Sequence, residues 1–128
     1  MTKQRGGRGS FLVVDDDLVA LEVSRERLEA VGFSVVTRNK ALGTSAYIRT
    51  EKPDYILLDV HMPGLPGDAL AKLLSDRDFE SKIILHSATK KDELVALASA
   101  CGAIGVIEKT DDDQDFRTQL QRCLQLKL

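Results

Sequence analysis

Residues 11–17 read FLVVDDD, and this stretch decides the fold. The four apolar residues 11–14 suit a parallel strand that is covered on both faces. Three aspartates follow at once, so the apolar run ends in a cluster of negative charge. A second segment has the same form, because YILL at residues 55–58 is followed directly by Asp59. The sequence therefore predicts two buried strands that each end in acid.

Three more apolar runs continue this rhythm: FSVV at residues 33–36, IIL at 83–85 and IGVI at 104–107. After each of the five runs a helical pattern follows, which predicts one helix per strand. The residues that mark these helices are Leu18, Leu21, Leu28 and Val31, with Ser24 filling the stripe; Ala41 to Thr50; Leu70, Leu73 and Leu74, after Pro66; Leu94, Leu97 and Cys101; and Phe116, Leu120, Cys123 and Leu124. Thr89 is expected to cap the fourth helix and Gly102 to end it.

The alternation of five strands with five helices predicts an α/β fold, a doubly wound parallel sheet with helices on both faces. In such a sheet, ligands bind beyond the carboxyl ends of the strands, at the point where the strand order reverses. In the flavodoxin-like order 2-1-3-4-5 that point lies between the first and third strands. Given this order, the acids at residues 15–16 and Asp59 would meet in one pocket.

Composition excludes several classes of protein. A chain of 128 residues, 43% hydrophobic and 30% charged, fits one globular domain, and a net charge of −2 offers no basic field for nucleic acid. No apolar run has membrane-spanning length, and the start of the chain lacks an apolar signal core, so a cytoplasmic protein is expected. Residues 1–9 are basic and glycine-rich, which predicts a flexible tail before a domain at 10–128, with a basic arm for a partner as the alternative. Cys101 and Cys123 are expected to be reduced and packed on helices.

The acidic residues suggest a metal site. Carboxylates placed close together repel one another, and a hard cation such as Mg²⁺ relieves that repulsion through oxygen ligands. A pocket of this kind suits phosphoryl transfer. The alternative is a solvated loop, in which Asp17 caps the first helix and Asp59 is an ordinary loop carboxylate before a turn. Spacing alone leaves both interpretations open.

Four segments in order resemble the receiver domains of response regulators in two-component signalling, close to a chemotaxis receiver. The resemblance runs from about Phe11 to the C-terminus, and each segment falls at the end of a predicted strand. The segments are LVVDDD at 12–17, LLDVHMPG at 57–64 with Gly67, IILHSA at 83–88, and Gly102-Ala103 through Glu108-Lys109.

The resemblance implies a role for each matching residue. Asp59 matches the phosphoacceptor, which takes a phosphoryl group from a phosphohistidine of a partner kinase. Asp15 and Asp16 match the acidic pair that holds Mg²⁺ or Mn²⁺, and the backbone carbonyl of His61 matches a further metal ligand. The implied protein is a signalling switch that assists its own phosphorylation and dephosphorylation, and not an enzyme in its own right.

The remaining matches concern the phosphoryl oxygens. Ser87 matches a hydroxyl that hydrogen-bonds one oxygen, and Lys109 matches a lysine that pairs with another. Family members usually have proline after this lysine, often through a cis bond, whereas this chain has Thr110. A cis bond before a residue other than proline costs about 3–4 kcal/mol, so a trans bond and a shifted loop are expected.

Three other positions bear on switching. The family often has an aromatic residue on the fifth strand, whose rotation is coupled to the Ser87 position, but here Val106 stands there. Output through the face of the fourth helix, fifth strand and fifth helix is therefore expected to be altered or weak. By the same resemblance, His61 and Thr89 match positions that tune how water reaches the phosphoryl group. An exposed loop histidine without that role is the alternative for His61.

The resemblance implies a sensor histidine kinase or phosphotransfer protein as partner, and a downstream protein on the output face. A monomer or weak homodimer is expected, with no nucleic acid and no membrane bound. The main alternative is a pseudo-receiver, a protein-interaction module that no longer uses phosphate. An aspartate-based phosphatase is disfavoured, because His61 stands where its second aspartate would be. A nucleotide-binding protein lacks support, since no glycine-rich loop follows the first strand. A stand-alone receiver and a domain of a larger protein both stay open.

Overall fold

The computed structural model describes residues 7–61, 80–88 and 90–128. Its sheet has five parallel strands in the order β2-β1-β3-β4-β5. The strands are β1 (Ser10–Val14), β2 (Ser34–Arg38), β3 (Tyr55–Asp59), β4 (Lys82–Ser87) and β5 (Gly105–Glu108). The predicted α/β sheet and its order are confirmed, and β1 and β3 are neighbours as the pocket requires.

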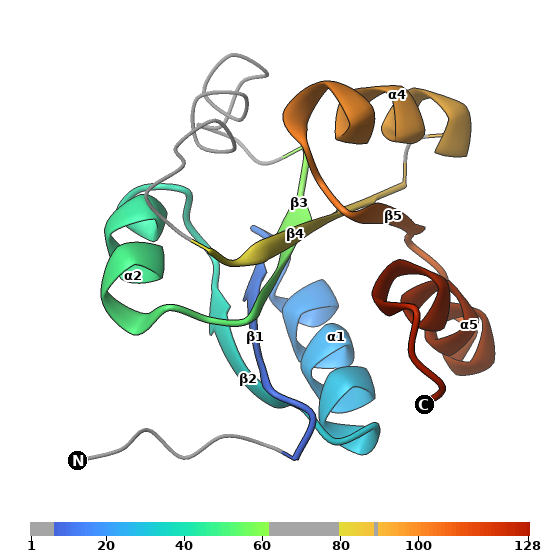
Figure 1. The fold of residues 1–128 in the computed structure, drawn as a ribbon, viewed down its shortest axis with the longest axis horizontal. Helices are drawn as coiled ribbons and strands as arrows, with labels where there is room; N and C mark the ends of the chain where they lie inside the picture. Colours follow the sequence, from blue (N-terminus) through green and yellow to red (C-terminus); the bar gives the residue numbers. More distant parts are fainter. Residues whose placement is uncertain (1–6, 62–79, 89) are drawn as a thin grey trace.

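Four helices lie among the described residues: α1 (Leu18–Ala30), α2 (Thr44–Glu51), α4 (Lys91–Cys101) and α5 (Asp113–Leu124). The prediction of five helices is thus confirmed only for these four. The helix expected around Leu70 to Leu74, after Pro66, falls outside the described residues. In Figure 1, α1 and α5 cover one face of the sheet, and α2 and α4 cover the other.

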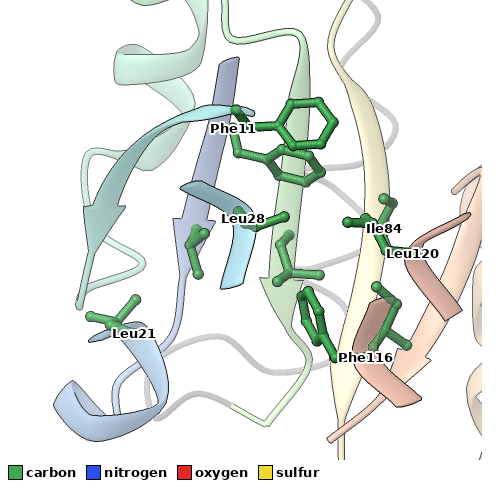
Figure 2. Close-up of a cluster of buried hydrophobic side chains, with 10 residues drawn as sticks. Phe11, Leu21, Leu28, Ile84, Phe116 and Leu120 are labelled. Atoms are coloured by element: carbon green, nitrogen blue, oxygen red, sulfur yellow. The ribbon is translucent and has the colours of Figure 1, made fainter. Parts of the chain in front are cut away.

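The sheet divides the core into two layers. On the first face, Phe11 and Val13 of β1 pack with the buried residues of α1 and α5, and Figure 2 shows this cluster. On the second face, Leu12 and Val14 pack with the buried residues of α2 and α4. The four apolar side chains of β1 are at most 1% exposed. A strand buried on both faces has no polar side to present, which explains the uninterrupted apolar run.

Helix α1 has the predicted N-cap, but one residue of its predicted apolar stripe is exposed. The Asp17 carboxylate accepts hydrogen bonds from the backbone N–H groups of Val19 and Ala20, so Asp17 is the N-cap. Leu21, Ser24 and Leu28 are buried, whereas Leu18 is 66% exposed. The expectation that Leu18 joins the apolar stripe was wrong. Leu18 opens the helix beside the acidic loop, beyond the end of β1, so its side chain reaches solvent.

The other helix ends follow local backbone chemistry. Helix α2 starts at Thr44, after the expected Ala41, because Gly43 takes a left-handed conformation with φ 83° immediately before it. Helix α4 starts at Lys91, with Lys90 at the N-cap position and no side-chain cap bond, while Thr89 lies outside the described residues. Gly102, with φ 76°, ends α4 as predicted.

The residues before β1 contact the domain. The Arg8 backbone N–H donates to the Gly32 carbonyl at 3.2 Å, and the Ser34 N–H donates to the Gly9 carbonyl at 3.0 Å. These bonds fasten two residues of the expected tail beside β2, and the division of the chain at residue 10 stays a prediction. Cys101 and Cys123 are both free. None of the helices in the described part of the chain is long and apolar enough to span a membrane.

Candidate functional site

The acidic residues meet where the sequence predicts. Asp15 directly follows β1, and Asp59 is the last residue of the neighbouring strand β3; the residues just before them, Val14 and Leu58, are paired in the sheet. Asp15 is 1% exposed and Asp59 4% exposed, while Asp16 lies at the surface. Ligand oxygens of all three carboxylates lie within 4.8 Å of one another. Two buried acids and one exposed acid therefore form a single cluster at the carboxyl edge of the sheet.

Lys109 closes this cluster from the end of β5. Its Nζ lies 2.8 Å from Oδ2 of Asp15 and 3.7 Å from Oδ2 of Asp59. Its backbone N–H donates to the Ser87 carbonyl at 2.9 Å, which ties the loop after β5 to the end of β4. The described residues contain no cis peptide bond, so the bond from Lys109 to Thr110 is trans, as predicted.

The protonation behaviour of the site follows from burial and charge. Burial raises the pKa of Asp59, and the charge of Asp15 adds to that rise, although a hydrogen bond from His61 and the charge of Lys109 oppose it. Burial alone would lower the pKa of Lys109, but the hydrogen bond with Asp15 and the charges of Asp59 and Asp15 outweigh it, so the pKa is raised. Lys109 is therefore charged at neutral pH, and one cation faces three carboxylates.

The donor set fits a hard divalent cation. Three carboxylates supply oxygen, which is the ligand that Mg²⁺ prefers, and their net negative charge exceeds what one lysine neutralises. The His61 N–H donates to Oδ1 of Asp59 at 3.1 Å, so the His61 backbone lies directly beside the Asp59 carboxylate. Asp15, Asp16 and Asp59 are the residues that could hold the ion, and the His61 carbonyl as a further ligand stays a prediction.

The other predicted residues fall into three groups. Ser87 ends β4 and is fully buried, with its strand neighbour His86 paired to Asp59. Val106 is partly buried and packs against the apolar cluster beneath α4. The side chain of His61 is exposed, and Thr89 lies outside the described residues. The structure thus brings Ser87 to the edge that carries the acids, and the assigned roles stay predictions.

Two residues near the site were not anticipated. His86 is 4% exposed, and burial lowers its pKa to about 4, so it is neutral at pH 7. Arg27 of α1 donates to the Thr110 carbonyl at 2.9 Å and to Asp113 at 2.8 Å. An arginine on a charged helix is ordinarily read as solvated, and its partners lie more than 80 positions away in the sequence. No local pattern could have revealed that contact.

Comparison with known proteins agrees with this geometry. Residues 11–121 match the family model of the response regulator receiver domain. The positive alginate biosynthesis regulatory protein of Pseudomonas aeruginosa is 32% identical over 120 residues, which cover 88% of this chain and 46% of that protein. Sporulation initiation phosphotransferase F of Bacillus subtilis is 24% identical and is matched over 94% of its length, with 91% of this chain covered.

Solved structures give the same result. A response regulator receiver protein from Burkholderia phymatum superposes with a TM-score of 0.73 at 26% identity, covering 92% of this chain and 96% of that one. The chemotaxis protein CheY4 of Vibrio cholerae has the same fold, with a TM-score of 0.76 at 22% identity over 89% of this chain and 97% of that one. The chain spans about half the length of the first curated relatives that it matches, at 46% and 52%. The family match covers most of the sequence, and this chain belongs to the response-regulator receiver family, the receivers of two-component systems.

Proposed function

We propose that this receiver accepts a phosphoryl group on Asp59 from a phosphohistidine of a sensor histidine kinase or a phosphotransfer protein. The observation that carries the proposal is the position of Asp59, buried at the end of β3 among two further acids and Lys109. A buried carboxylate beside a lysine and a cation site combines a nucleophile with the charges that the transfer requires. Among the three acids of the cluster, Asp59 alone is the last residue of a strand, whereas Asp15 and Asp16 follow the end of β1.

The proposed chemistry needs positioning and charge neutralisation more than covalent catalysis. A carboxylate oxygen of Asp59 attacks phosphorus, a new O–P bond forms, and the P–N bond to the imidazole breaks with its electron pair going to nitrogen. Mg²⁺, when bound by Asp15, Asp16 and Asp59, supplies positive charge to the phosphoryl oxygens. Lys109 would pair with one of those oxygens, and the Ser87 hydroxyl would donate to another.

The consequence of the transfer is a change of surface. An aspartyl phosphate adds negative charge and strong acceptor oxygens at the edge of the sheet. A downstream protein would read that change on the face of α4, β5 and α5, where Val95 of α4 is an exposed apolar side chain. The proposal places the chain in the cytoplasm as a signalling switch. It includes the tuning of dephosphorylation at His61 and Thr89.

One observation favours a second candidate, a pseudo-receiver that binds partners without phosphate. The Val106 side chain packs into the apolar cluster beneath α4 and carries no ring that could rotate. Phosphorylation at Asp59 would then leave the output face unchanged. The two candidates differ in whether the phosphoryl group forms and whether partner binding depends on it.

A direct test uses phosphoramidate, a small donor whose P–N bond stands in for that of phosphohistidine. The protein is incubated with the donor and Mg²⁺, and its intact mass is then measured by mass spectrometry. We expect one added phosphoryl group in the wild type and none in Asp59→Asn or without Mg²⁺. Asp17→Asn is the matched control, because Asp17 adjoins the acidic pair yet caps α1, and asparagine caps a helix as well. Persistent absence of the adduct in the wild type would exclude the phosphoacceptor role.

A further inference from the structure

Arg27 joins helix α1 to the loop that follows Lys109. Its side chain is 11% exposed, and its Nε donates to Oδ1 of Asp113 at 2.8 Å. Its Nη1 donates to the carbonyl of Thr110 at 2.9 Å. The guanidinium also lies over the Phe116 ring, 5.2 Å from the ring centre. Three contacts from two sides therefore hold this side chain in one position, in the planar geometry that suits arginine.

The loop after β5 is anchored at Lys109, Thr110 and Asp112. The Lys109 N–H is bound by the Ser87 carbonyl at 2.9 Å, and the Thr110 carbonyl is bound by Arg27. The Thr110 hydroxyl accepts from the N–H of Asp112 at 3.1 Å, and Asp112 in turn caps α5. Because Thr110 is not proline, no ring fixes its backbone, and these hydrogen bonds supply the restraint instead.

The placement of Lys109 depends on that restraint. A lysine carries a point charge on a flexible four-carbon stem, so the reach of its ammonium is set by where its backbone is held. The Nζ of Lys109 lies 2.8 Å from one carboxylate and 3.7 Å from the next, and a small movement of the backbone would change both distances. Transfer rates are sensitive to such shifts, and a misplacement of about 1 Å can cost about 100-fold.

We propose that Arg27 is a positioning residue for phosphoryl transfer, which acts by holding the Thr110 carbonyl and thereby fixing the Lys109 ammonium at the acidic cluster. The inference rests on the proposed function of Asp59. Arg27 itself touches neither the acceptor nor the acids that could hold the metal. Its effect is therefore expected chiefly on the rate of transfer, and Mg²⁺ should bind no more weakly than in the wild type.

Arg25 provides a matched control. It lies on the same helix, two residues before Arg27, and its side chain is 42% exposed. It pairs with Glu22 of the same helix. Arg25→Met removes the same charge from the same helix without touching the loop after β5. Arg27→Met keeps an aliphatic stem to cover Phe116 but has no donor, and Arg27→Lys keeps the charge with a single donor group.

The experiment measures the rate of adduct formation at Asp59 over a range of phosphoramidate concentrations at saturating Mg²⁺. We expect Arg27→Met to lower the maximal rate by about 10-fold or more, Arg27→Lys to fall between it and the wild type, and Arg25→Met to match the wild type. Thermal unfolding of each variant confirms that it is folded, and calorimetric titration is expected to show a Mg²⁺ affinity no weaker than that of the wild type. Wild-type rates in Arg27→Lys would mean that charge alone matters, and would overturn the positioning role.

A double-mutant cycle with Lys109→Ala separates positioning from a general structural defect. If Arg27 acts through Lys109, Arg27→Met should cause little further slowing once Lys109 has been removed. Equal slowing in both backgrounds would overturn the inference. If the wild type is phosphorylated at Asp59 and Arg27→Met forms the adduct at the same rate, only the role of Arg27 is refuted. If the wild type accepts no phosphoryl group, both the proposed function and the role of Arg27 are refuted.

Discussion

Lys109 lies closer to Asp15 than to Asp59, with its Nζ 2.8 Å from Oδ2 of the first and 3.7 Å from Oδ2 of the second. In this arrangement the lysine neutralises a proposed metal ligand before it meets any phosphoryl group. The same cation therefore has two opposed effects. It competes electrostatically with Mg²⁺ for the acidic cluster, and it would stabilise the transferred group.

The first prediction follows from that opposition. Lys109→Ala should bind Mg²⁺ more tightly than the wild type, because three carboxylates then face the ion without a competing charge. The same variant should form the aspartyl phosphate roughly 100-fold more slowly, since one preorganised donor to the phosphoryl oxygens is lost. Calorimetric titration and adduct rates measure the two effects. Lys82→Ala, at the opposite end of β4, is the control and should change neither quantity.

Gly105 and Cys123 form a tight contact between β5 and α5. A Cβ added at Gly105 would lie 2.6 Å from the sulfur of Cys123, which is shorter than any unstrained contact. Gly105→Ala should therefore lower the free energy of unfolding by about 1–3 kcal/mol in urea titrations. Shortening the partner with Cys123→Ala should recover most of the loss made by Gly105→Ala. If the loss of unfolding free energy in the double variant equals the sum of the losses in the two single variants, the contact with Cys123 does not cause the destabilisation by Gly105→Ala.

His86 predicts a dependence of stability on pH. Burial, with smaller contributions from the charges of Lys109 and Arg27, lowers its pKa to about 4 in the native state, against 6.5 for a free histidine. The unfolded chain thus binds a proton below pH 6.5 that the native chain takes up only near pH 4. The stabilising contribution of neutral His86 is fully present above pH 6.5. As the pH drops toward 4, the free energy of unfolding falls by up to about 3 kcal/mol. His86→Leu should lose that component, so equal slopes in wild type and variant would contradict it.

Gln119 covers the free edge of the sheet at β5. Its Oε1 accepts from the Glu108 N–H at 2.8 Å and its Nε2 donates to the Glu108 carbonyl at 3.2 Å, so one side chain satisfies both outward backbone groups. Gln119→Leu would leave both groups unpaired and should cost about 1–3 kcal/mol of unfolding free energy. Gln114→Leu, at an exposed position of the same helix, serves as the control in the same chemical denaturation and should change stability much less.

Much of the fold could be predicted because the central strands are buried on both faces, which forces continuous apolar runs such as residues 11–14. The acidic cluster could be located because parallel strands bring their carboxyl ends to one edge. The exposure of Leu18 was missed, since helical periodicity does not report where a helix passes the end of the sheet. The contact of Arg27 with Thr110 was missed because it is set by packing between distant segments, and no local pattern encodes it.

The central claim is that the phosphoryl group resides on Asp59, and its position can be read chemically. Borohydride reduces an aspartyl phosphate to homoserine, and fragment mass spectrometry then locates the converted residue. After treatment with phosphoramidate and Mg²⁺, the account predicts homoserine at position 59, and its loss in Asp59→Asn and in metal-free buffer. Conversion at Asp15 or Asp16 with Asp59 unchanged, or no conversion at all, would contradict it.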